Sequence, residues 1–419
     1  MNELSDRSIA LLHYSCPPII GGAEFILEAQ ARWFRRYGAD VRVIVGKGEM
    51  FHEDIPVTEF ACLQSDHPRK DLVRDELESG REKEFVRQVE EAKNTLQPAL
   101  DSSNTWIIHN LFTMPFNLIA TRALRELVTE IQIQSYAWTH DIAWLDERYD
   151  LPDRRPWNLL KYPADVTAYV GISNHRRNQL NELFGNHVDA EIPVVHDAVE
   201  FELLHDLDPS IKRIYQEHKM YRDDIIALYP ARIVRRKNFE LALQIVHNLK
   251  KLGPQIHFIV TGPPDPHNQD SEEYYCSLLQ LRNQLDLEEE VIFCHELKHP
   301  ETEKRLEINF NRVRQLYRIS DMLLMTTRGE GFGLPLLEAG LTRTVICCSN
   351  VEPLPEIGGK TPLYFELDDP PEAIAGEIHE HLQSQSALKL QRRARKRFTW
   401  PAVFETELIP LLRDTFPLD

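Results

Sequence analysis

Short apolar runs alternate with amphipathic helical segments along the whole chain, and this alternation constrains the fold more than any other feature. Because parallel strands are joined by crossover connections that a helix usually supplies, the pattern predicts an α/β fold with parallel sheets covered by helices on both faces. In the first half we predict strands at residues 9–14, 41–45, 106–109, 133–138, 167–172 and 192–195, with helices at residues 117–130 and 174–184.

The alternation stops in a polar segment and then starts again, which predicts two domains. Residues 196–224 hold Pro209 and show no clear sheet period, so the linker is placed there. Further strands are predicted at residues 225–229, 256–261, 291–293, 322–325 and 344–348. We therefore predict Rossmann-like domains over residues 1–200 and 201–398 and a terminal helix over residues 399–419 that packs back on the first domain. Residues 66–93 are predicted to form a solvated helical insertion, and residues 371–416 to be helical with a break at Trp400-Pro401.

Charge and composition exclude several classes of protein. The 48 Lys and Arg residues against 66 Asp and Glu give a net charge of −18, which is repelled by nucleic acids and anionic lipids. No apolar run approaches the roughly 20 residues that span a bilayer. The six cysteines form no C-x-x-C pair, and the apolar run at residues 9–12 is predicted to be a strand and not a signal peptide. These features favour a cytoplasmic protein without nucleic-acid partners.

The strongest local signal is the glycine-rich segment at residues 328–338. It follows a predicted strand and leads into a helix whose first turn should hold Pro335. Its glycines allow a tight turn and a close ligand approach, and the free amides of the helix start suit a phosphate. Glu330 and Glu338 can then face one ligand at different depths. The alternative is a glycine-rich turn with two incidental acids.

A second signal, Arg232 and Lys237, follows the first strand of the second domain. Two cations at the carboxyl end of a strand can clamp a diphosphate and offset the charge that develops on a leaving group. The alternative is a helix start with solvated basic residues, although cations there oppose the helix dipole. Arg235 and Arg236 are interpreted as solvated neighbours.

Two weaker signals lie in the first domain. Gly21-Gly22-Ala23-Glu24 follows the first strand, and two glycines at a helix start let a substrate lie on the backbone. Trp138-Thr139-His140-Asp141 ends a later strand and places a histidine at its carboxyl end. The alternatives are a packing turn for the first segment and a structural histidine for the second.

Taken together and in this order, the four segments resemble the retaining GT-B glycosyltransferases of family 4, the glycosyl transferases group 1. Glu330 and Glu338 match the Glu-x7-Glu motif of that family, and Arg232 and Lys237 match its Arg-x4-Lys pair. The glycine loop matches at residues 21–24 and the active-site histidine at His140, and likeness extends to residues 317–321, 354–356 and 397–400. The resemblance implies a GT-B fold, in which two Rossmann-like domains face each other across a cleft.

The resemblance also implies the reaction and the role of each residue. A hexosyl group, glucosyl or mannosyl, would pass with retention from a GDP- or UDP-linked sugar to a hydroxyl acceptor, without a metal. The catalytic residues would be His140, Glu330, Arg232 and Lys237. The donor site would comprise Gly22, Arg232, Lys237, Glu330, Gly331, Phe332, Gly333, Leu334 and Glu338. Arg232 and Lys237 would neutralise the diphosphate, Glu338 would hold the ribose, and His140 would hold a sugar hydroxyl or the acceptor.

Several alternatives stay open. Another GT-B activity, such as nucleotide-sugar epimerisation or phosphorolysis, and a non-catalytic nucleotide-sugar-binding subunit both use a related fold. Residues 195–200 and 340–345 depart from the usual runs of the family, and residues 295–309 form a longer loop, so base, sugar and acceptor are not fixed. A soluble acceptor is favoured over a lipid, because the aromatics of residues 32–36 fit a stripe that faces the protein core and not a membrane-binding helix. If the soluble acceptor is anionic, Arg148, Arg154 or Arg155 would contact it. Asp206 and Asp208 are predicted to be solvated and not to bind metal.

Overall fold

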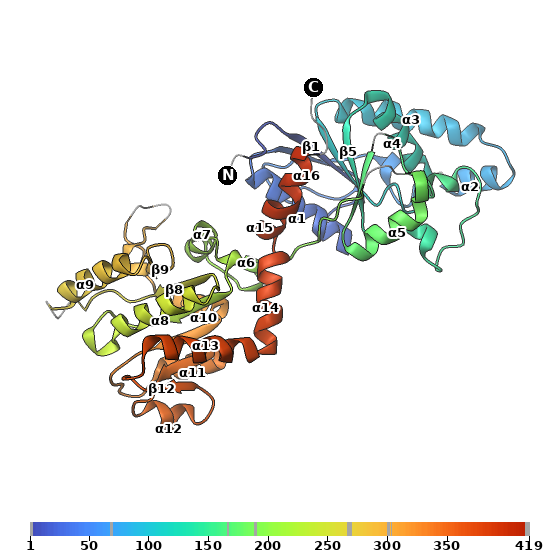
Figure 1. The fold of residues 1–419 in the computed structure, drawn as a ribbon. Coiled ribbons are helices and arrows are strands. Elements are labelled where there is room, and N and C mark those ends of the chain that lie inside the picture. The colour runs from blue at the N-terminus through green and yellow to red at the C-terminus, as the bar shows by residue number, and fades with distance from the viewer. Residues whose placement is uncertain are drawn as a thin grey trace. The chain divides into compact units, whose positions relative to one another are not determined.

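The computed structural model describes residues 3–67, 70–165, 167–187, 191–265, 270–299, 302 and 304–414, which form two compact units. The N-terminal unit comprises Met1–Val199 together with Val403–Asp419, and the C-terminal unit comprises Glu200–Ala402. Each unit is a six-stranded parallel sheet flanked by helices (Figure 1), which confirms the predicted α/β class with two Rossmann-like domains.

The sheet of the N-terminal unit has the strand order β3-β2-β1-β4-β5-β6. Its central strands are buried on both faces, as continuous apolar runs require in a parallel sheet. The strands are β1 (Ser8–Ser15), β2 (Asp40–Lys47), β3 (Val57–Glu59), β4 (Thr105–His109), β5 (Gln134–Thr139) and β6 (Thr167–Gly171). The helices of this part are α1 (Gly22–Arg36), η1 (Ala61–Leu63), α2 (Lys70–Glu78), α3 (Lys83–Leu100), α4 (Leu118–Ile131), η2 (Ala143–Leu145), η3 (Trp157–Leu160), α5 (Asn174–Phe184) and η4 (Gly185–His187).

The C-terminal sheet repeats this topology, with β7 to β12 in the places of β1 to β6. Its strands are β7 (Ile225–Tyr229), β8 (Ile256–Val260), β9 (Val291–Phe293), β10 (Met322–Met325), β11 (Val345–Ser349) and β12 (Leu363–Phe365). Its helices are α6 (Phe201–Leu204), α7 (Pro209–Glu217), η5 (Met220–Arg222), η6 (Arg235–Lys237), α8 (Phe239–Lys251), α9 (Asp270–Gln284), η7 (Cys294–Glu296), α10 (Phe310–Ile319), α11 (Leu334–Thr342), α12 (Leu354–Gly358), α13 (Pro371–Ser384) and α14 (Ser386–Arg397).

The end of the chain is helical and packs on the N-terminal unit, of which residues 403–414 are a part. It comprises α15 (Trp400–Val403), the π-helical turn η8 (Phe404–Leu408) and α16 (Ile409–Asp414). The ring of Phe404 contacts those of Trp33, Phe34 and Tyr37 on α1, and Glu407 accepts a hydrogen bond from the backbone N–H of His196. Residues 415–419 of the predicted terminal helix lie outside the described residues.

Several predicted elements are wrong in extent or role. The described part of residues 66–93 is not a solvated insertion, because α3 buries Phe85, Val89 and Ala92 and packs against α4. The many charges hid this apolar stripe, and residues 68 and 69 lie outside the described residues. Residues 192–195 form only an isolated bridge to Gly171. Residues 196–224 hold the helices α6, α7 and η5 besides the crossing of the chain from one unit to the other. The three-residue strands β3 and β12 were not predicted, because they are largely exposed or half-buried, whereas the equally short β9 is buried and was predicted.

The break near the C-terminus is also displaced from its predicted position. Trp400 and Pro401 begin α15, since a proline is tolerated in the first turn of a helix, where its missing N–H has no partner to lose. The helical path is interrupted instead at Phe398, the C-cap of α14, and between α13 and α14 at Gln385.

A buried ion pair ties α14 to the C-terminal sheet. The guanidinium of Arg395 donates to both carboxylate oxygens of Asp321, at 3.2 and 2.7 Å, and both side chains are fully buried. Asp321 Oδ2 also accepts from the backbone N–H of Ile226 at 2.7 Å, at the start of β7. Burial disfavours the charged guanidinium, but the carboxylate outweighs this effect and raises the pKa of Arg395. The pair therefore fixes the amino ends of β7 and β10.

None of the helices in the described ranges is both long enough and apolar enough to cross a membrane. Within these ranges the aromatics of residues 32–36 point inward as predicted, with Trp33 and Phe34 buried. The adjacent Cys347 and Cys348 are buried in β11, where they pack as small apolar side chains.

Candidate active site

In a doubly wound sheet, ligands bind beside the carboxyl ends of the two strands at which the strand order reverses. These are β1 and β4 in the N-terminal unit and β7 and β10 in the C-terminal unit. The predicted site segments follow these strands or their neighbour β5: Gly22 follows β1, His140 follows β5, Arg232 and Lys237 follow β7, and Glu330 follows β10.

In the C-terminal unit, Lys237 and Glu330 meet between the loops after β7 and β10. Lys237 Nζ forms an ion pair with Glu330 Oε1, although 93 residues separate them in sequence. The two side chains are only 10% and 8% exposed. Because a nearly buried charge is costly without a partner, this pairing explains how both residues are held at the sheet edge.

Two buried hydroxyl groups hold the backbone of Lys237 in place. Its carbonyl oxygen accepts from Tyr229 Oη at 3.0 Å and from Thr326 Oγ1 at 3.2 Å. Burial and the nearby Glu330 charge raise the pKa of Tyr229 well above its usual value, so the phenol stays protonated and keeps donating. The ends of β7 and β10 thereby orient the lysine before any ligand binds.

Arg232 lies on the same loop but is far more open. Its side chain is 64% exposed, and its Nη1 atom is 3.9 Å from Asp265 Oδ1. The loop passes close to Gly262, where an added Cβ would lie 2.3 Å from the carbonyl oxygen of Ala231. Only glycine permits this approach. In the described part of the chain, no hydrogen bond or ion pair links Arg232 to Lys237 or Glu330.

Arg236 belongs to this site, although the sequence was interpreted as giving it a solvated role. Its Nη1 atom donates to the carbonyl oxygen of Gly329 and lies 3.6 Å from Glu330 Oε2. Arg235, in contrast, lies over the ring of Tyr274. The difference is not visible in the sequence, because η6 turns adjacent side chains in different directions.

The glycine-rich loop leads into α11 as predicted, with Pro335 in the first turn. Gly333 caps the helix in the left-handed region at φ 96°, and a Cβ there would also strike Leu354. The remaining donor-site residues of this loop are open to solvent: Gly331, Phe332 and Leu334.

Glu338 lies on α11 and is anchored by a tyrosine. Tyr317 Oη donates to Glu338 Oε2 at 2.9 Å and also lies 3.1 Å from the carbonyl oxygen of Pro335. Burial and the Glu338 charge raise the pKa of Tyr317, so the phenol remains a donor. No bond joins Glu330 to Glu338 within the described ranges. The two acids therefore have separate partners.

In the N-terminal unit, Gly22 is the first residue of α1, and the space above its backbone is open. Glu24 in the same turn accepts from Ser15 Oγ at 2.7 Å, and its Oε1 atom lies 3.6 Å from His13 Nε2. Burial raises the pKa of Glu24, but the contacts with His13 and Ser15 outweigh it and lower the pKa to about 2. The carboxylate of Glu24 thus lies on the side of the glycine loop that faces Ser15 and His13.

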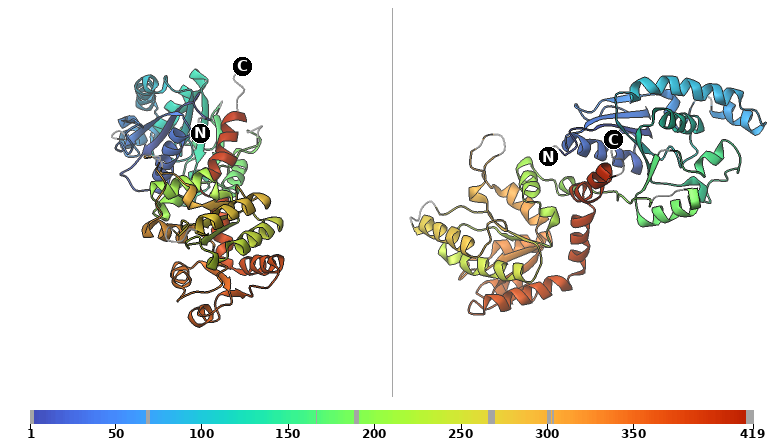
Figure 2. Two further views of the ribbon diagram at one scale, coloured as in Figure 1. Left: turned by 90° about the vertical axis from the view of Figure 1, so that its left-hand side faces the viewer. Right: turned by 45° about the horizontal axis from the view of Figure 1, so that its top comes forward.

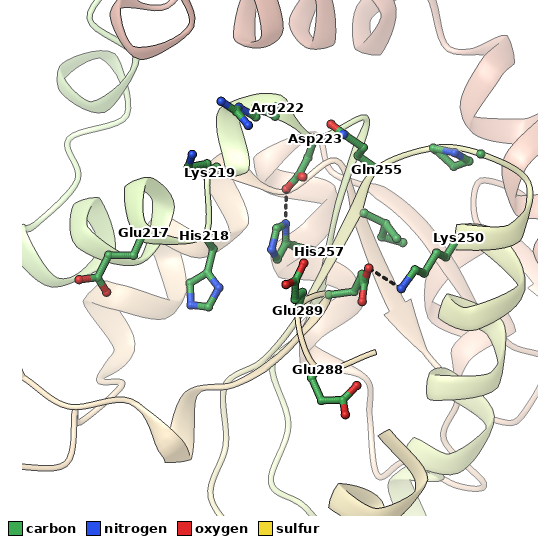
Figure 3. Close-up of a pocket in the computed structure, with 14 residues that line it drawn as sticks. Glu217, His218, Lys219, Arg222, Asp223, Lys250, Gln255, His257, Glu288 and Glu289 are labelled. Carbon is green, nitrogen blue, oxygen red and sulfur yellow. Dashed lines mark hydrogen bonds and ion pairs between the residues drawn. The ribbon is translucent and has the colours of Figure 1, made fainter. Parts of the chain in front are cut away.

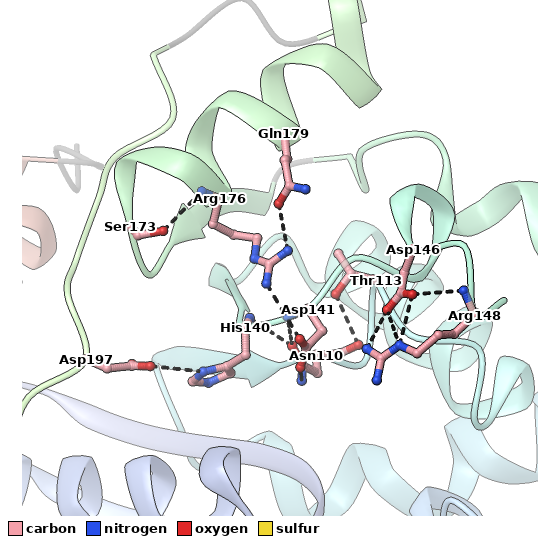
Figure 4. A network of polar contacts seen from close by, with 10 residues as sticks. All are labelled: Asn110, Thr113, His140, Asp141, Asp146, Arg148, Ser173, Arg176, Gln179 and Asp197. Atoms are coloured by element: carbon pink, nitrogen blue, oxygen red, sulfur yellow. Dashed lines mark hydrogen bonds and ion pairs between the residues drawn. The ribbon is translucent and has the colours of Figure 1, made fainter.

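His140 lies at the carboxyl end of β5 in a network of polar contacts (Figure 4). Its Nδ1 atom is 3.5 Å from Asp197 Oδ2, and its Nε2 atom is 3.0 Å from His109 Nδ1. The Oδ1 atom of Asn110 accepts from the backbone N–H groups of His140 and Asp141, at 2.9 and 3.1 Å. Asn110 itself has a left-handed backbone with φ 56°, which asparagine tolerates better than most residues.

His109, Asn110, Asp197 and Tyr317 were not singled out from the sequence. The only sequence signal for the first two is their place at the end of a predicted strand, and Asp197 lies in a segment assigned to the linker. Asp208, predicted to be solvated, instead caps α7 and pairs with Arg312 at 2.8 Å. Among the described residues, no cluster of His, Cys, Asp and Glu suits a metal ion.

A depression of about 670 Å³ lies at the amino ends of β8 and β9 (Figure 3). It is lined by charges of both signs, and two contacts cross it: His257 Nδ1 to Asp223 Oδ2 at 2.6 Å, and Lys250 to Glu290 at 2.7 Å. No predicted site residue lines it, because those residues lie at the opposite edge of the sheet. The mixed charge does not select one class of ligand.

Residues 210–397 match the family model described as "Glycosyl transferases group 1". This match lies within the C-terminal unit and covers less than half of the chain, so the glycosyl transferases group 1 are the family that this unit resembles. Arg232, Lys237, Glu330 and Glu338, which carry the resemblance in this unit, all lie within the matched residues.

Two curated relatives are similar to longer parts of the chain. The chain is 26% identical to a mannosylglucosylglycerate synthase of Petrotoga mobilis over 63% of each chain, so it spans less than two thirds of that relative. It is 22% identical to a mannosylglucosylglycerate synthase of Thermotoga maritima over 79% of this chain and 78% of the other. Among solved structures, the sucrose-phosphate synthase of Thermosynechococcus elongatus is similar over 97% of this chain and 98% of that chain, with 16% identity and a TM-score of 0.39.

Proposed function

We propose that this enzyme transfers a hexosyl group, glucosyl or mannosyl, with retention, from a GDP- or UDP-linked sugar to a hydroxyl of a soluble acceptor. The observation that carries the proposal is the meeting of Lys237 and Glu330 at the carboxyl ends of β7 and β10, beside the start of α11. A cation for a diphosphate, a carboxylate for sugar hydroxyls and free helix amides are the groups that a nucleotide sugar requires.

The C-terminal unit would bind the donor. Lys237 has three donor hydrogens, so it can keep its contact with Glu330 and still bind a phosphate oxygen. Arg232, which is largely exposed, would contact the other phosphate, and the amides of Gly333 and Leu334 would add neutral donors. Glu338 would accept hydrogen bonds from the ribose, and Glu330 from the hexose.

The reaction would be a substitution on one face of the sugar. The bond between the anomeric carbon and the phosphate oxygen breaks, and the acceptor oxygen bonds to the anomeric carbon on the same face. The acceptor proton passes to the departing phosphate oxygen. The residues of the site contribute orientation and stabilisation of the diphosphate, so no protein carboxylate is needed as a nucleophile.

The N-terminal unit would bind the acceptor, with Gly22 allowing a close approach to the backbone and His140 holding a hydroxyl. The names of the two synthase relatives support a mannosyl donor and an acceptor of the glucosylglycerate kind, which carries a carboxylate. Arg148, one candidate for that carboxylate, is already bonded to Asp146, whereas Arg154 lies over the ring of Trp157.

The proposal is tested by incubating the purified chain with GDP-mannose, UDP-glucose or ADP-glucose and a panel of sugar and sugar-acid acceptors. We expect nucleoside diphosphate to be released only when an acceptor is present, the new linkage to keep the anomeric configuration, and the rate to persist in EDTA. Release without an acceptor, or an epimerised free donor, would point to another GT-B activity. Tight nucleotide-sugar binding without turnover on the whole panel would point to a sensor subunit.

A further inference from the structure

Three side chains of the N-terminal unit form a row that we call the histidine row: His109, His140 and Asp197. The rings of His109 and His140 lie edge to edge, with their centroids 5.3 Å apart and nearly parallel planes. His140 Nε2 is bonded to His109 Nδ1 at 3.0 Å, and His140 Nδ1 faces Asp197 Oδ2 at 3.5 Å. Both ring nitrogens of His140 are therefore engaged by the protein.

The position of the protons in the row follows from what surrounds it. His109 is fully buried, and burial, together with the neighbouring His140 and His13, lowers the pKa of His109 well below its usual value. His109 is therefore neutral and carries one proton. Its Nε2 atom is buried and has no hydrogen-bond partner in the described structure.

Two arrangements satisfy the bond between the rings. In the first arrangement His140 donates from Nε2 to His109 Nδ1, so the proton of His109 lies on the buried Nε2 of His109 and has no partner. A neutral His140 then directs the lone pair of Nδ1 toward the Asp197 carboxylate. In the second arrangement His109 donates from Nδ1 to His140 Nε2, and the only group left without a partner is the lone pair of His109 Nε2. His140 then carries its proton on Nδ1, which faces Asp197. A buried N–H without a partner costs more than a bare acceptor, so the second arrangement is favoured.

We propose that His109 is a positioning residue that holds the proton of His140 on Nδ1, so that His140 serves as a hydrogen-bond donor and not as a base. When no substrate is bound, Asp197 accepts the hydrogen bond from His140 Nδ1–H. During transfer, a hydroxyl oxygen of the sugar or of the acceptor accepts this hydrogen bond together with Asp197 or in place of it. The 3.5 Å separation is longer than an ordinary hydrogen bond, which makes this partner exchangeable. The kinetic part of the inference rests on the proposed function; the tautomer does not.

The tautomer is measured on the full chain labelled with ¹⁵N-histidine, by two-bond ¹H–¹⁵N correlation spectra. The His140 signals are assigned by their loss in His140→Gln. We expect a protonated Nδ1 and an unprotonated Nε2 in the native chain. A protonated Nε2 in a neutral His140 would overturn the proposal, whether or not the chain transfers sugar.

Two substitutions of His109 separate positioning from packing. His109→Asn keeps an N–H donor toward His140 Nε2, whereas His109→Leu removes it and preserves an apolar filling. We expect His109→Leu to populate the Nε2–H tautomer and to lower kcat about tenfold, the cost of one misdirected hydrogen bond, with donor KM unchanged. His109→Asn should restore the Nδ1–H signal and most of kcat. Equal tautomers and rates in both variants would overturn the proposal.

Asp197→Asn gives a check that does not disturb the buried ring. Its amide oxygen still accepts from Nδ1–H, so we expect the Nδ1–H signal to persist. A collapse of the Nδ1–H signal in this variant would mean that the carboxylate charge, and not His109, fixes the proton, and would overturn the assignment to His109. This variant also decides the question if His109→Leu does not fold.

Discussion

The two sheets share one strand order, yet the sites at their carboxyl edges are built from opposite kinds of chemistry. In the N-terminal unit, the side chains of His109, His140 and Asn110 form a network of hydrogen bonds, with the carboxylates of Asp141 and Asp197 at its margin. In the C-terminal unit, Lys237 and Glu330 form a nearly buried pair of full charges.

The difference follows from what can be buried. A neutral imidazole can be fully enclosed at little cost, as His109 is, whereas a charged group needs a partner of opposite sign, as Lys237 has. Neutral donors and acceptors suit uncharged hydroxyl groups, and free cations suit phosphates. The contrast therefore agrees with the proposed division between acceptor binding and donor binding.

The largest expected effect is a loss of stability in the C-terminal unit when one member of its buried ion pair, Arg395 and Asp321, is removed. Arg395→Leu would leave Asp321 buried without its partner, and we expect it to lower the free energy of unfolding by about 3–5 kcal/mol, measured by urea denaturation. Arg393→Leu on the exposed side of the same helix is the matched control and should change stability by less than about 0.5 kcal/mol. A loss below about 1 kcal/mol for Arg395→Leu would contradict the prediction.

The next effect concerns activity. Lys237→Ala removes the cation nearest Glu330, and we expect kcat/KM to fall by about 10²–10³-fold, as when one preorganised charge-stabilising donor is lost. Steady-state kinetics with the donor and acceptor found in the panel measure it. Lys251→Ala, at the far end of α8, should keep normal rates. If Lys237→Ala kept near-normal kcat/KM, the cation would have no part in the reaction.

A smaller effect is expected from the hydrogen-bond network of the N-terminal unit. Asn110→Ala places an ordinary side chain in a left-handed conformation and removes the oxygen that accepts from His140 and Asp141. We expect a stability loss of about 2 kcal/mol, of which the backbone contributes about 1–2. Asn110→Gly keeps the conformational freedom and isolates the hydrogen-bond part. Equal losses in both variants would show that the backbone conformation is not costly for alanine.

The smallest effect is a pH dependence from Glu24. Because its pKa falls to about 2 in the folded chain from an ordinary value of 4.5, its contribution is complete above about pH 4.5 and is lost as the pH falls toward 2. In Glu24→Gln, unfolding curves between pH 6 and pH 2 should therefore converge with those of the native chain at the acid end. Glu53→Gln, an exposed carboxylate outside this cluster, is the control. Parallel curves for the native chain and Glu24→Gln would contradict the prediction.

Much of the architecture could be predicted because buried segments are apolar, and this pattern can be recognised within a few residues of sequence. Central strands such as β1, β7 and β10 are continuous apolar runs, and the turn into α11 carries its glycine and proline at readable positions. The same reasoning failed for α3, whose apolar stripe is diluted by charges, and for the short strands β3 and β12 at the sheet edges.

Within the candidate site, the sequence supplied Lys237, Glu330 and His140, each beside the end of an apolar run. It did not supply the partners of His140 or the anchor of Glu338. Tyr317 was noticed only as part of a likeness and not as the anchor of Glu338, and Asp197 lay in a supposed linker. Arg235 and Arg236 are alike in sequence, but only Arg236 contacts the Glu330 loop.

By itself, then, the sequence determined the α/β class, the restart of the pattern in a second unit and the loops that carry the chemistry, because periodicity and glycine placement act over a few residues. Tertiary structure alone decided which groups meet: Lys237 with Glu330, and His140 with His109 and Asp197. Those meetings depend on strand order, which brings together loops many residues apart, and on burial, which decides whether a group is charged or neutral once it is there.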